Sequence, residues 1–259
     1  MSLEDVLRAL ADEPARCAVF ADFDGTLAHV IEDRDAVVPV EGVIDRVAEL
    51  SARIGRFAVV SGRPVSFLEQ FFPEHIELSG LYGIEHWTDG RMLVDRAALE
   101  WLPVVRTTAR VATEEFGAAV VENKTYSMTL HYRHDGDPAF GQRVTAWAEH
   151  RAHMTGLEAR VAKMSIELHP PVGRTKADAV ADMLTRIRSA AFFGDDVGDI
   201  PAFDLLAGWS AAGRLDAEAR VLVRSAETSP ALEAGSTDVC DSPAAVVDVF
   251  DRMIEAARA

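Results

Sequence analysis

Cysteine is nearly absent from this 259-residue sequence, in which only Cys17 and Cys240 occur. Two thiols so far apart form neither a disulfide framework nor the paired spacing of a zinc site. Both lie among apolar residues, so we expect small buried hydrophobic side chains at these positions. The sequence therefore predicts neither disulfide bonds nor a metal site with cysteine ligands.

Long hydrophobic runs are also missing. No segment approaches the roughly 20 apolar residues that a membrane-spanning helix needs. Residues 1–15 are charged and lack the apolar stretch of a signal peptide. We therefore expect a cytoplasmic protein with no membrane partner.

Positive charge is scarce, because 26 basic residues stand against 42 acidic ones and give a net charge of −16. Such a surface repels nucleic acid and anionic membranes, so neither is expected as a partner. An anionic small molecule can still bind where side chains or a metal supply local positive charge. Nothing in the sequence fixes an oligomeric state, and a monomer is compatible with it.

Short apolar runs alternate with helical patterns, which predicts an α/β fold with a Rossmann-like parallel sheet. Residues 41–54 are expected to form an amphipathic helix and 244–257 a closing helix. The expected strands are residues 18–21, 57–60 and 190–193, with outer strands near Trp209, Val221 and Val239.

The middle of the chain has a different pattern. Residues 125–133 alternate between apolar and polar, which is typical of a half-buried antiparallel strand. A hairpin is expected from Val161 to Leu168, turning at Lys163-Met164. Two helical patterns cover about 101–116 and 138–154. We therefore expect an inserted α+β cap domain at residues 100–170, within a core formed by 1–99 and 171–259.

The first chemical signal is Asp22-Phe23-Asp24-Gly25-Thr26, directly after a predicted buried strand. Ligands of open α/β sheets bind just beyond the carboxyl ends of the strands. Asp22 and Asp24 can point into one small space, which suits a metal and a nucleophile with an acid/base partner. The alternative is an ordinary Asp-Gly turn.

The second signal is Ser61-Gly62-Arg63, which follows the strand at 57–60. A hydroxyl beside a flexible glycine can hydrogen-bond a phosphoryl oxygen, so we assign Ser61, Gly62 and Arg63 to phosphate binding. The alternative is that these residues only form the turn that connects the strand to the following helix.

The third signal is Lys176. Thr175 is a predicted N-cap and Asp178 completes a capping box, which places Lys176 in the first helical turn. A cation at that positive helix end is favourable when an anion binds there as well. A solvated surface lysine is the alternative.

The fourth signal is the acidic segment 194–199, in which Asp195, Asp196 and Asp199 follow a predicted strand. Three carboxylates so close together repel one another without a cation, and hard oxygen ligands suit Mg²⁺. The alternative for Asp199 is a helix N-cap before Pro201.

These signals fit one reaction. Four carboxylates and a phosphate ester require Mg²⁺, Lys176 and backbone N–H groups to offset their charge. We predict that Asp22 becomes phosphorylated while Asp24 protonates the leaving oxygen and then activates water. The predicted Mg²⁺ ligands are Asp22, the backbone carbonyl of Asp24, Asp195 and Asp199.

The four motifs resemble those of the haloacid dehalogenase superfamily, and residues 18–250 are similar to the trehalose-6-phosphate phosphatases. Segments 121–124, 130–133 and 166–168 are similar to that family's sugar-binding segments. The resemblance implies a haloacid dehalogenase-like fold, Mg²⁺ and a sugar phosphate substrate, trehalose 6-phosphate. It further implies that sugar hydroxyls are held by Glu122, Lys124, Arg133 and Glu167.

Several positions depart from the family's pattern and bear on the sugar and on metal affinity. The family usually has Thr, Glu, Arg, Gly and His at the positions of Gly198, Ile200, His169, Ala177 and Tyr82, respectively. The alternatives are therefore a phosphatase for another glycosyl or hexose phosphate, and an inactive regulatory protein that binds a sugar phosphate. A dehalogenase is disfavoured, because Asp24 supplies the acid/base that ester hydrolysis needs.

Overall fold

A computed structural model describes residues 1–31, 33, 36–132, 138–162, 164–225 and 228–258. The chain divides into two compact units, one made of Met1–Leu93 with Arg174–Ala259 and the other of Val94–Gly173. No helix within the described ranges has both the length and the apolar character required to cross a bilayer.

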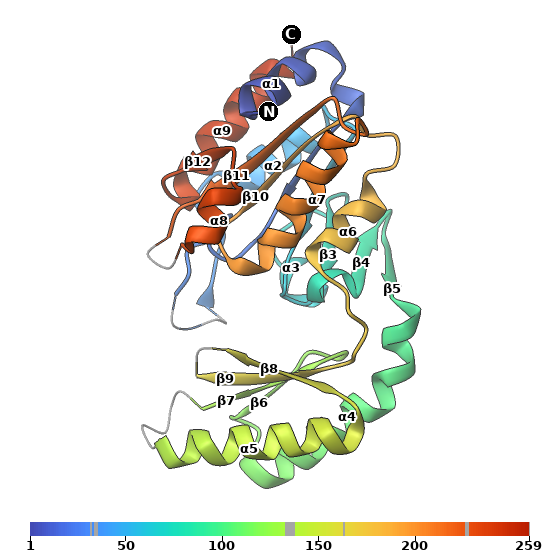
Figure 1. The fold of residues 1–259 in the computed structure, drawn as a ribbon, viewed down its shortest axis with the longest axis vertical. Coiled ribbons are helices and arrows are strands. Elements are labelled where there is room, and N and C mark those ends of the chain that lie inside the picture. The colour runs from blue at the N-terminus through green and yellow to red at the C-terminus, as the bar shows by residue number, and fades with distance from the viewer. Residues whose placement is uncertain (32, 34–35, 133–137, 163, 226–227, 259) are drawn as a thin grey trace. The chain divides into compact units, whose positions relative to one another are not determined.

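The first unit is built on an eight-stranded sheet (Figure 1). In spatial order the strands are β12 (Asp238–Cys240), β11 (Ala217–Val223), β10 (Ser189–Gly194), β1 (Cys17–Ala21), β2 (Arg56–Val60), β3 (Glu77–Gly80), β4 (Glu85–Thr88) and β5 (Arg91–Val94). The strands from β12 to β3 run parallel, and β4 is antiparallel to β3. The predicted α/β fold with a large parallel sheet is confirmed.

Helices cover both faces of this sheet. Alternate residues of β1 face opposite sides, with Val19 and Ala21 in one core cluster and Ala18 and Phe20 in the other. The first cluster includes side chains of α1 (Leu3–Asp12), α2 (Val43–Ser51), α3 (Val65–Leu68) and α9 (Pro243–Ala256). The second includes side chains of α6 (Lys176–Met183), α7 (Ile200–Ala211) and α8 (Pro230–Gly235).

The predicted strand near Trp209 is wrong, because Trp209 lies in α7. Ala202, Phe203 and Leu206 are the buried residues of this helix, and their spacing of one to three residues follows a helical turn. Trp209 continues that side, packs against the second core cluster and carries the Arg214 guanidinium 3.4 Å above its ring. The strands near Val221 and Val239 and the closing helix are confirmed.

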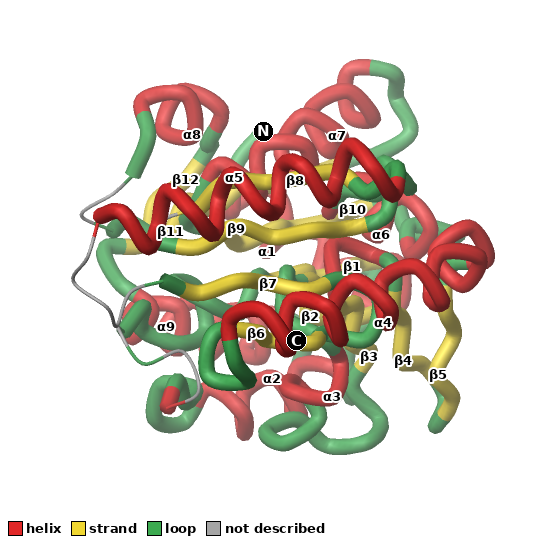
Figure 2. The backbone as a smooth tube through the Cα atoms, turned by 90° about the horizontal axis from the view of Figure 1, so that it is seen from below, coloured by secondary structure: helices red, strands yellow, loops and turns green. Residues whose placement is uncertain are grey.

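The second unit is a four-stranded antiparallel sheet with helices on one face (Figure 2). Its strands, in spatial order, are β6 (Val121–Asn123), β7 (Met128–His131), β9 (Ser165–His169) and β8 (Glu158–Ala162). The helices α4 (Arg96–Phe116) and α5 (Pro138–Thr155) pack on Leu130 and Ile166 through Val105 and Val144, among others. The predicted antiparallel strand, hairpin and helices are confirmed, although Lys163 of the expected turn lies outside the described residues.

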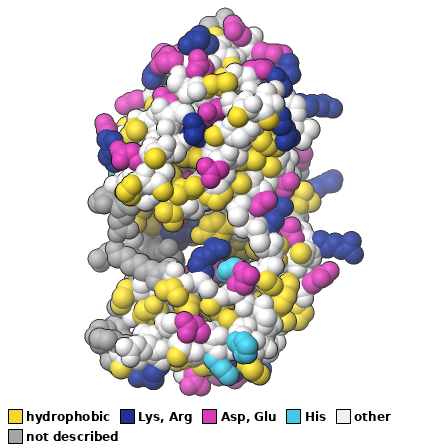
Figure 3. All heavy atoms as spheres, in the orientation of Figure 1, with side chains coloured by type: hydrophobic (Ala, Val, Ile, Leu, Met, Phe, Trp, Pro, Cys, Tyr) yellow, Lys and Arg dark blue, Asp and Glu magenta, His cyan; other side chains and the backbone are white. Residues whose placement is uncertain are grey.

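The surface and the cysteines agree with the composition. Figure 3 shows acidic and basic side chains interspersed over the visible face of each unit. Cys17 and Cys240 are free and buried, as expected. Burial raises the pKa of each thiol to about 11, so both are protonated and unreactive near neutral pH.

Candidate active site

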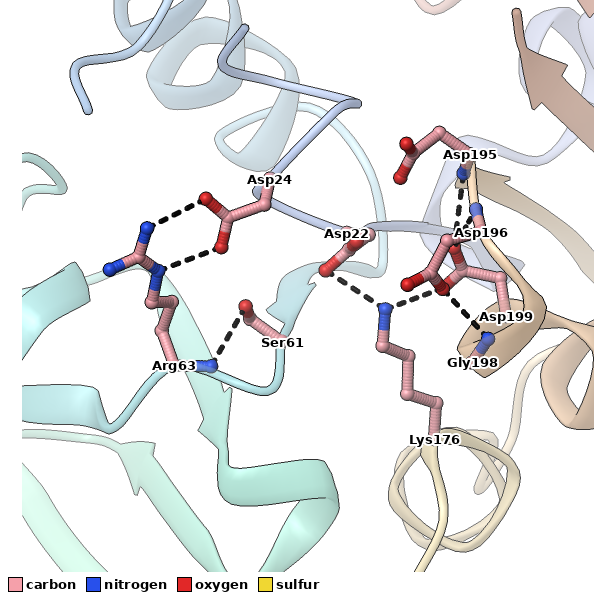
Figure 4. Close-up of polar contacts among 9 residues, drawn as sticks. All are labelled: Asp22, Asp24, Ser61, Arg63, Lys176, Asp195, Asp196, Gly198 and Asp199. Atoms are coloured by element: carbon pink, nitrogen blue, oxygen red, sulfur yellow. Dashed lines mark hydrogen bonds and ion pairs between the residues drawn. The ribbon is translucent and has the colours of Figure 1, made fainter. Parts of the chain in front are cut away.

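The predicted motifs converge at one edge of the eight-stranded sheet (Figure 4). Because β10, β1 and β2 are parallel neighbours, the loops at their carboxyl ends meet at that edge. Asp22 follows β1, and its backbone N–H donates to the Phe193 carbonyl of β10 over 2.9 Å. The pairing of β1 with β10 therefore continues to Asp22 and fixes the position of its backbone.

Gly25 allows the loop after β1 to approach Asp195. Its φ of +79° is left-handed, and a Cβ there would lie 2.0 Å from the Asp195 Oδ2 atom. The Gly25 N–H donates to the Ala28 carbonyl over 2.8 Å, which closes the turn. Any side chain at this position would therefore displace Asp195 or the turn.

Lys176 is buried at the centre of the site. Thr175 and Asp178 form the predicted capping box, so Lys176 does begin α6. The Lys176 Nζ lies 2.9 Å from Asp22 Oδ1 and 2.6 Å from Asp199 Oδ1. The alternative of a solvated lysine is therefore wrong.

Asp199 connects Lys176 to the acidic loop. Its Oδ2 accepts the backbone N–H groups of Asp195 and Asp196 over 3.0 and 3.2 Å. It occupies the N-cap position of α7 but makes no capping bond with its side chain, whereas Asp196 caps the turn η4 (Val197–Asp199) through Gly198. Both oxygens of Asp199 are thus engaged in fixing the loop and Lys176.

The electrostatics of this cluster are strongly perturbed. Burial raises the pKa of Asp22 well above its usual value, although Lys176 offsets part of this effect. Burial, followed by Asp199 and Asp196, raises the pKa of Asp195 to about 8. Burial opposes the charge on Lys176 too, but Asp199 and Asp22 still raise the pKa of this lysine well above its usual value. The buried carboxylates outnumber the one ammonium group, so a further cation would be favourable here.

The same carboxylates fit a divalent cation. Asp22, Asp195 and Asp199 each offer an oxygen, and these oxygens lie within 4.8 Å of one another. All three side chains are buried, and such hard oxygen ligands are those that Mg²⁺ prefers. The Asp24 carboxylate points toward Arg63 (Figure 4), so its backbone carbonyl remains the predicted ligand.

Arg63 binds Asp24, although we assigned it to phosphate. Its Nε and a terminal nitrogen donate to the two Asp24 oxygens over 2.7 and 2.9 Å. The guanidinium also lies 4.3 Å from the ring centre of Phe67, while the Arg63 backbone N–H donates to the Ser61 hydroxyl over 3.1 Å. A planar guanidinium matches a carboxylate with two parallel bonds, which explains this pairing. Ser61 and Gly62 follow β2, the parallel neighbour of β1, and therefore lie at the same sheet edge as Asp22 and Asp24.

Polar side chains of the second unit lie on the sheet face opposite its helices. Register places Glu122, Thr129 and Glu167 in one row across β6, β7 and β9. The Glu167 Oε1 atom accepts the Ser127 hydroxyl over 2.7 Å and lies 3.5 Å from Lys124 Nζ. Glu122, Lys124 and Glu167 therefore share this face, as expected, whereas Arg133 lies outside the described residues.

The sequence reasoning assigned no role to three polar residues in or beside this row, which are Ser127, Thr129 and His131. His131 Nε2 lies 2.8 Å from Glu122 Oε2, and Ser127 bonds Glu167 as described above. The buried Thr129 hydroxyl has no hydrogen-bond partner among the described residues. Alternation placed all three on the polar face, but only the register of the strands shows which side chains meet.

Comparison with known proteins shows which family the sequence matches. Residues 20–225 match the sequence model of the trehalose-phosphatase family. A trehalose-phosphate phosphatase of Mycobacterium ulcerans is 31% identical over 218 residues, which cover 78% of this chain and 55% of that protein. The chain thus spans about half the length of this relative.

Two solved structures share the fold. The C-terminal domain of Candida albicans trehalose-6-phosphate phosphatase has a TM-score of 0.73 and 19% identity, and the match covers 98% of this chain and 97% of that one. The C-terminal domain of a Candida albicans trehalose synthase regulatory protein has a TM-score of 0.71 and 11% identity, with coverage of 97% and 98%. These likenesses show the fold, and the family match covers most of the sequence. The chain belongs to the trehalose-phosphatase family.

Proposed function

We propose that this protein is a Mg²⁺-dependent phosphatase that hydrolyses trehalose 6-phosphate to trehalose and phosphate. The observation that carries the proposal is the buried ammonium of Lys176, which contacts Asp22 and Asp199 beside Asp195. Family membership and the phosphatase relatives support the substrate. We expect the reaction to occur in the cytoplasm.

In the first half-reaction, an Asp22 oxygen attacks phosphorus in line with the leaving sugar oxygen. The phosphorus–oxygen bond to the sugar breaks, and Asp24 delivers a proton to that oxygen. In the second, Asp24 accepts a proton from water as the water oxygen attacks phosphorus. The bond from phosphorus to Asp22 then breaks and phosphate leaves, which restores both carboxyl groups.

Charge stabilisation comes from groups already in place around Asp22. Lys176 lies within 2.9 Å of the Asp22 oxygen and can bind the phosphoryl oxygens, with the Ser61 hydroxyl and the Gly62 N–H as further donors. Asp22, Asp195 and the carbonyl of Asp24 would hold Mg²⁺, which would act as a Lewis acid and offset phosphoryl charge. Both oxygens of Asp199 accept hydrogen bonds, so we assign this residue to positioning Lys176 as well as to the metal site.

The deciding experiment is phosphate release from a panel of sugar phosphates that includes trehalose 6-phosphate. We expect trehalose 6-phosphate to be preferred with Mg²⁺ and the activity to disappear with EDTA. Preference for another glycosyl or hexose phosphate would overturn the substrate, and binding without hydrolysis would identify a regulatory protein. The melting temperature reports Mg²⁺ binding independently of activity, because Mg²⁺ should raise the melting temperature of the wild type but not that of Asp195→Asn.

Arg63→Lys should impair Asp24 by removing its two-point contact. We expect kcat/KM for the sugar phosphate to fall by about 10- to 100-fold, because a lysine cannot orient the carboxyl group in the same way. With p-nitrophenyl phosphate, whose leaving group departs without a proton, the first half-reaction should be affected much less. An equal loss with both substrates would show that Arg63 does not act through proton transfer.

Glu167→Gln should weaken binding of the sugar and leave the chemistry intact. The variant keeps the shape of the side chain but removes the charge that Lys124 and Ser127 contact. We expect KM for trehalose 6-phosphate to rise about tenfold with kcat nearly constant. Glu149→Gln, on the exposed side of α5, is the matched control. An unchanged KM would remove Glu167 from the sugar site.

A further inference from the structure

The turn after β3 has an unusual backbone. Leu81 and Tyr82 adopt left-handed conformations in succession, with φ values of 49° and 59°, although neither is glycine. Each such residue costs about 1 kcal/mol or more, because its Cβ crowds the following carbonyl oxygen. A strained pair of this kind persists only where the surrounding structure holds it, and such pairs are found at functional sites.

The turn is held by three parts of the active site. The N–H groups of Leu81 and Tyr82 donate to the carbonyls of Arg63 and Ser61, each over 3.0 Å. Arg174, just before α6, donates to the Gly83 carbonyl over 3.2 Å. The strained backbone is therefore tied to both neighbours of Gly62 and to the segment that leads to Lys176.

The Tyr82 ring lies between two loops of the site. A Cβ at Gly62 would lie 2.8 Å from both the Cζ and the hydroxyl oxygen of Tyr82, so a side chain there would force the ring to move. A Cβ at Gly198, in the acidic loop, would lie 3.8 Å from the ring. Tyr82 is only half-buried. The phenol thus covers Gly62 on one side, approaches Gly198 on the other, and keeps part of its surface open.

We propose that Tyr82 contacts the substrate, and that its hydroxyl donates a hydrogen bond to the phosphate group held at Ser61 and Gly62. This inference rests on the proposed function, because that function places the phosphate at these residues. The strained turn is what brings a phenol to a position that the Ser61-Gly62-Arg63 loop cannot supply from its own side chains. A hydrogen bond to a charged phosphate is stronger than one between neutral groups.

The test compares Tyr82→Phe with the wild type, using the full chain and Mg²⁺. Inorganic phosphate is the probe, and its dissociation constant is measured by calorimetry. We expect the constant to rise about tenfold in the variant, and kcat/KM for trehalose 6-phosphate to fall by at least as much. Tyr132→Phe is the matched control, because its ring packs in the core of the second unit and its hydroxyl bonds the Ser165 carbonyl.

Equal phosphate affinity in Tyr82→Phe and the wild type would overturn the inference, whatever the catalytic rates are. Weaker phosphate binding by the variant, in a wild type that hydrolyses none of the esters, would retain the inference and overturn the proposed reaction. A double-mutant cycle of Gly62→Ala with Tyr82→Ala tests the packing. We expect the added methyl group to weaken phosphate binding less once the ring is gone, and additive effects would contradict the contact.

Discussion

Asp22→Asn is expected to lose turnover by on the order of 10⁴-fold or more, because an amide cannot form the phosphorylated intermediate. The measurement is phosphate release from trehalose 6-phosphate under saturating Mg²⁺, so that weaker metal binding does not account for the loss. Asp204→Asn, on the exposed side of α7, makes the same chemical change away from the site and should keep full activity. Substantial residual turnover in Asp22→Asn would refute the nucleophile.

The same variant should remain folded, which separates catalysis from stability. Burial raises the pKa of Asp22, so its ionised form costs folding free energy above its unfolded pKa. The amide removes this cost. We expect metal-free Asp22→Asn to be at least as stable as the wild type near neutral pH, as measured by urea unfolding in EDTA. A large loss of stability would mean that the Asp22 charge serves mainly to compensate Lys176.

The active-site motifs could be predicted because their chemistry is local. Asp22 and Asp24 directly follow a buried strand, so the sequence alone places them at the carboxyl end of that strand. The capping box likewise places Lys176 at the start of a helix. Parallel strand order then brings these segments together without any further information. The prediction that they share one site therefore depended on topology more than on any single motif.

The parts that could not be predicted depend on tertiary contacts. Nothing in the segment Ser61-Gly62-Arg63 shows that its guanidinium pairs with Asp24. The sequence indicated that Asp199 is a metal ligand or an N-cap, but it did not show that the oxygens of Asp199 also bind Lys176 and the loop of Asp195. Tyr82 was noted only as an unusual residue type, because its left-handed backbone is imposed by neighbours distant in sequence.

The fold by itself does not decide catalysis. Solved structures with the same fold include both a phosphatase and a regulatory protein, at identities that carry no functional conclusion. Function depends on the side chains of a site and not on the fold, so the residues beyond the strand ends are what matter for catalysis. In this chain Lys176 is in direct contact with Asp22 and Asp199 at that site.

Lys176→Met tests the charge balance of that set. Removing the ammonium leaves Asp22, Asp195 and Asp199 buried without a cation, so we expect metal-free protein to lose about 3–5 kcal/mol of stability near neutral pH, together with its turnover. Arg106→Met, which removes an exposed cation from α4, should change stability by no more than about 0.5 kcal/mol. Urea unfolding in EDTA measures both variants.

The pH dependence of this loss has a definite sign. Burial raises the pKa values of the carboxyl groups in the folded state, that of Asp195 to about 8. At acid pH these groups are protonated and neutral, so the loss of the Lys176 cation no longer leaves buried negative charge without a partner. The deficit of Lys176→Met relative to the wild type should therefore be small at about pH 5 and grow as pH rises through about 8. Combining Asp199→Asn with Lys176→Met restores the net charge of the cluster, so most of the stability should return. The activity should not return, because the Lys176 ammonium that binds the phosphoryl oxygens is still missing. A deficit that is constant across this range would show that Lys176 stabilises the fold by packing and that its charge is not what the three carboxylates require.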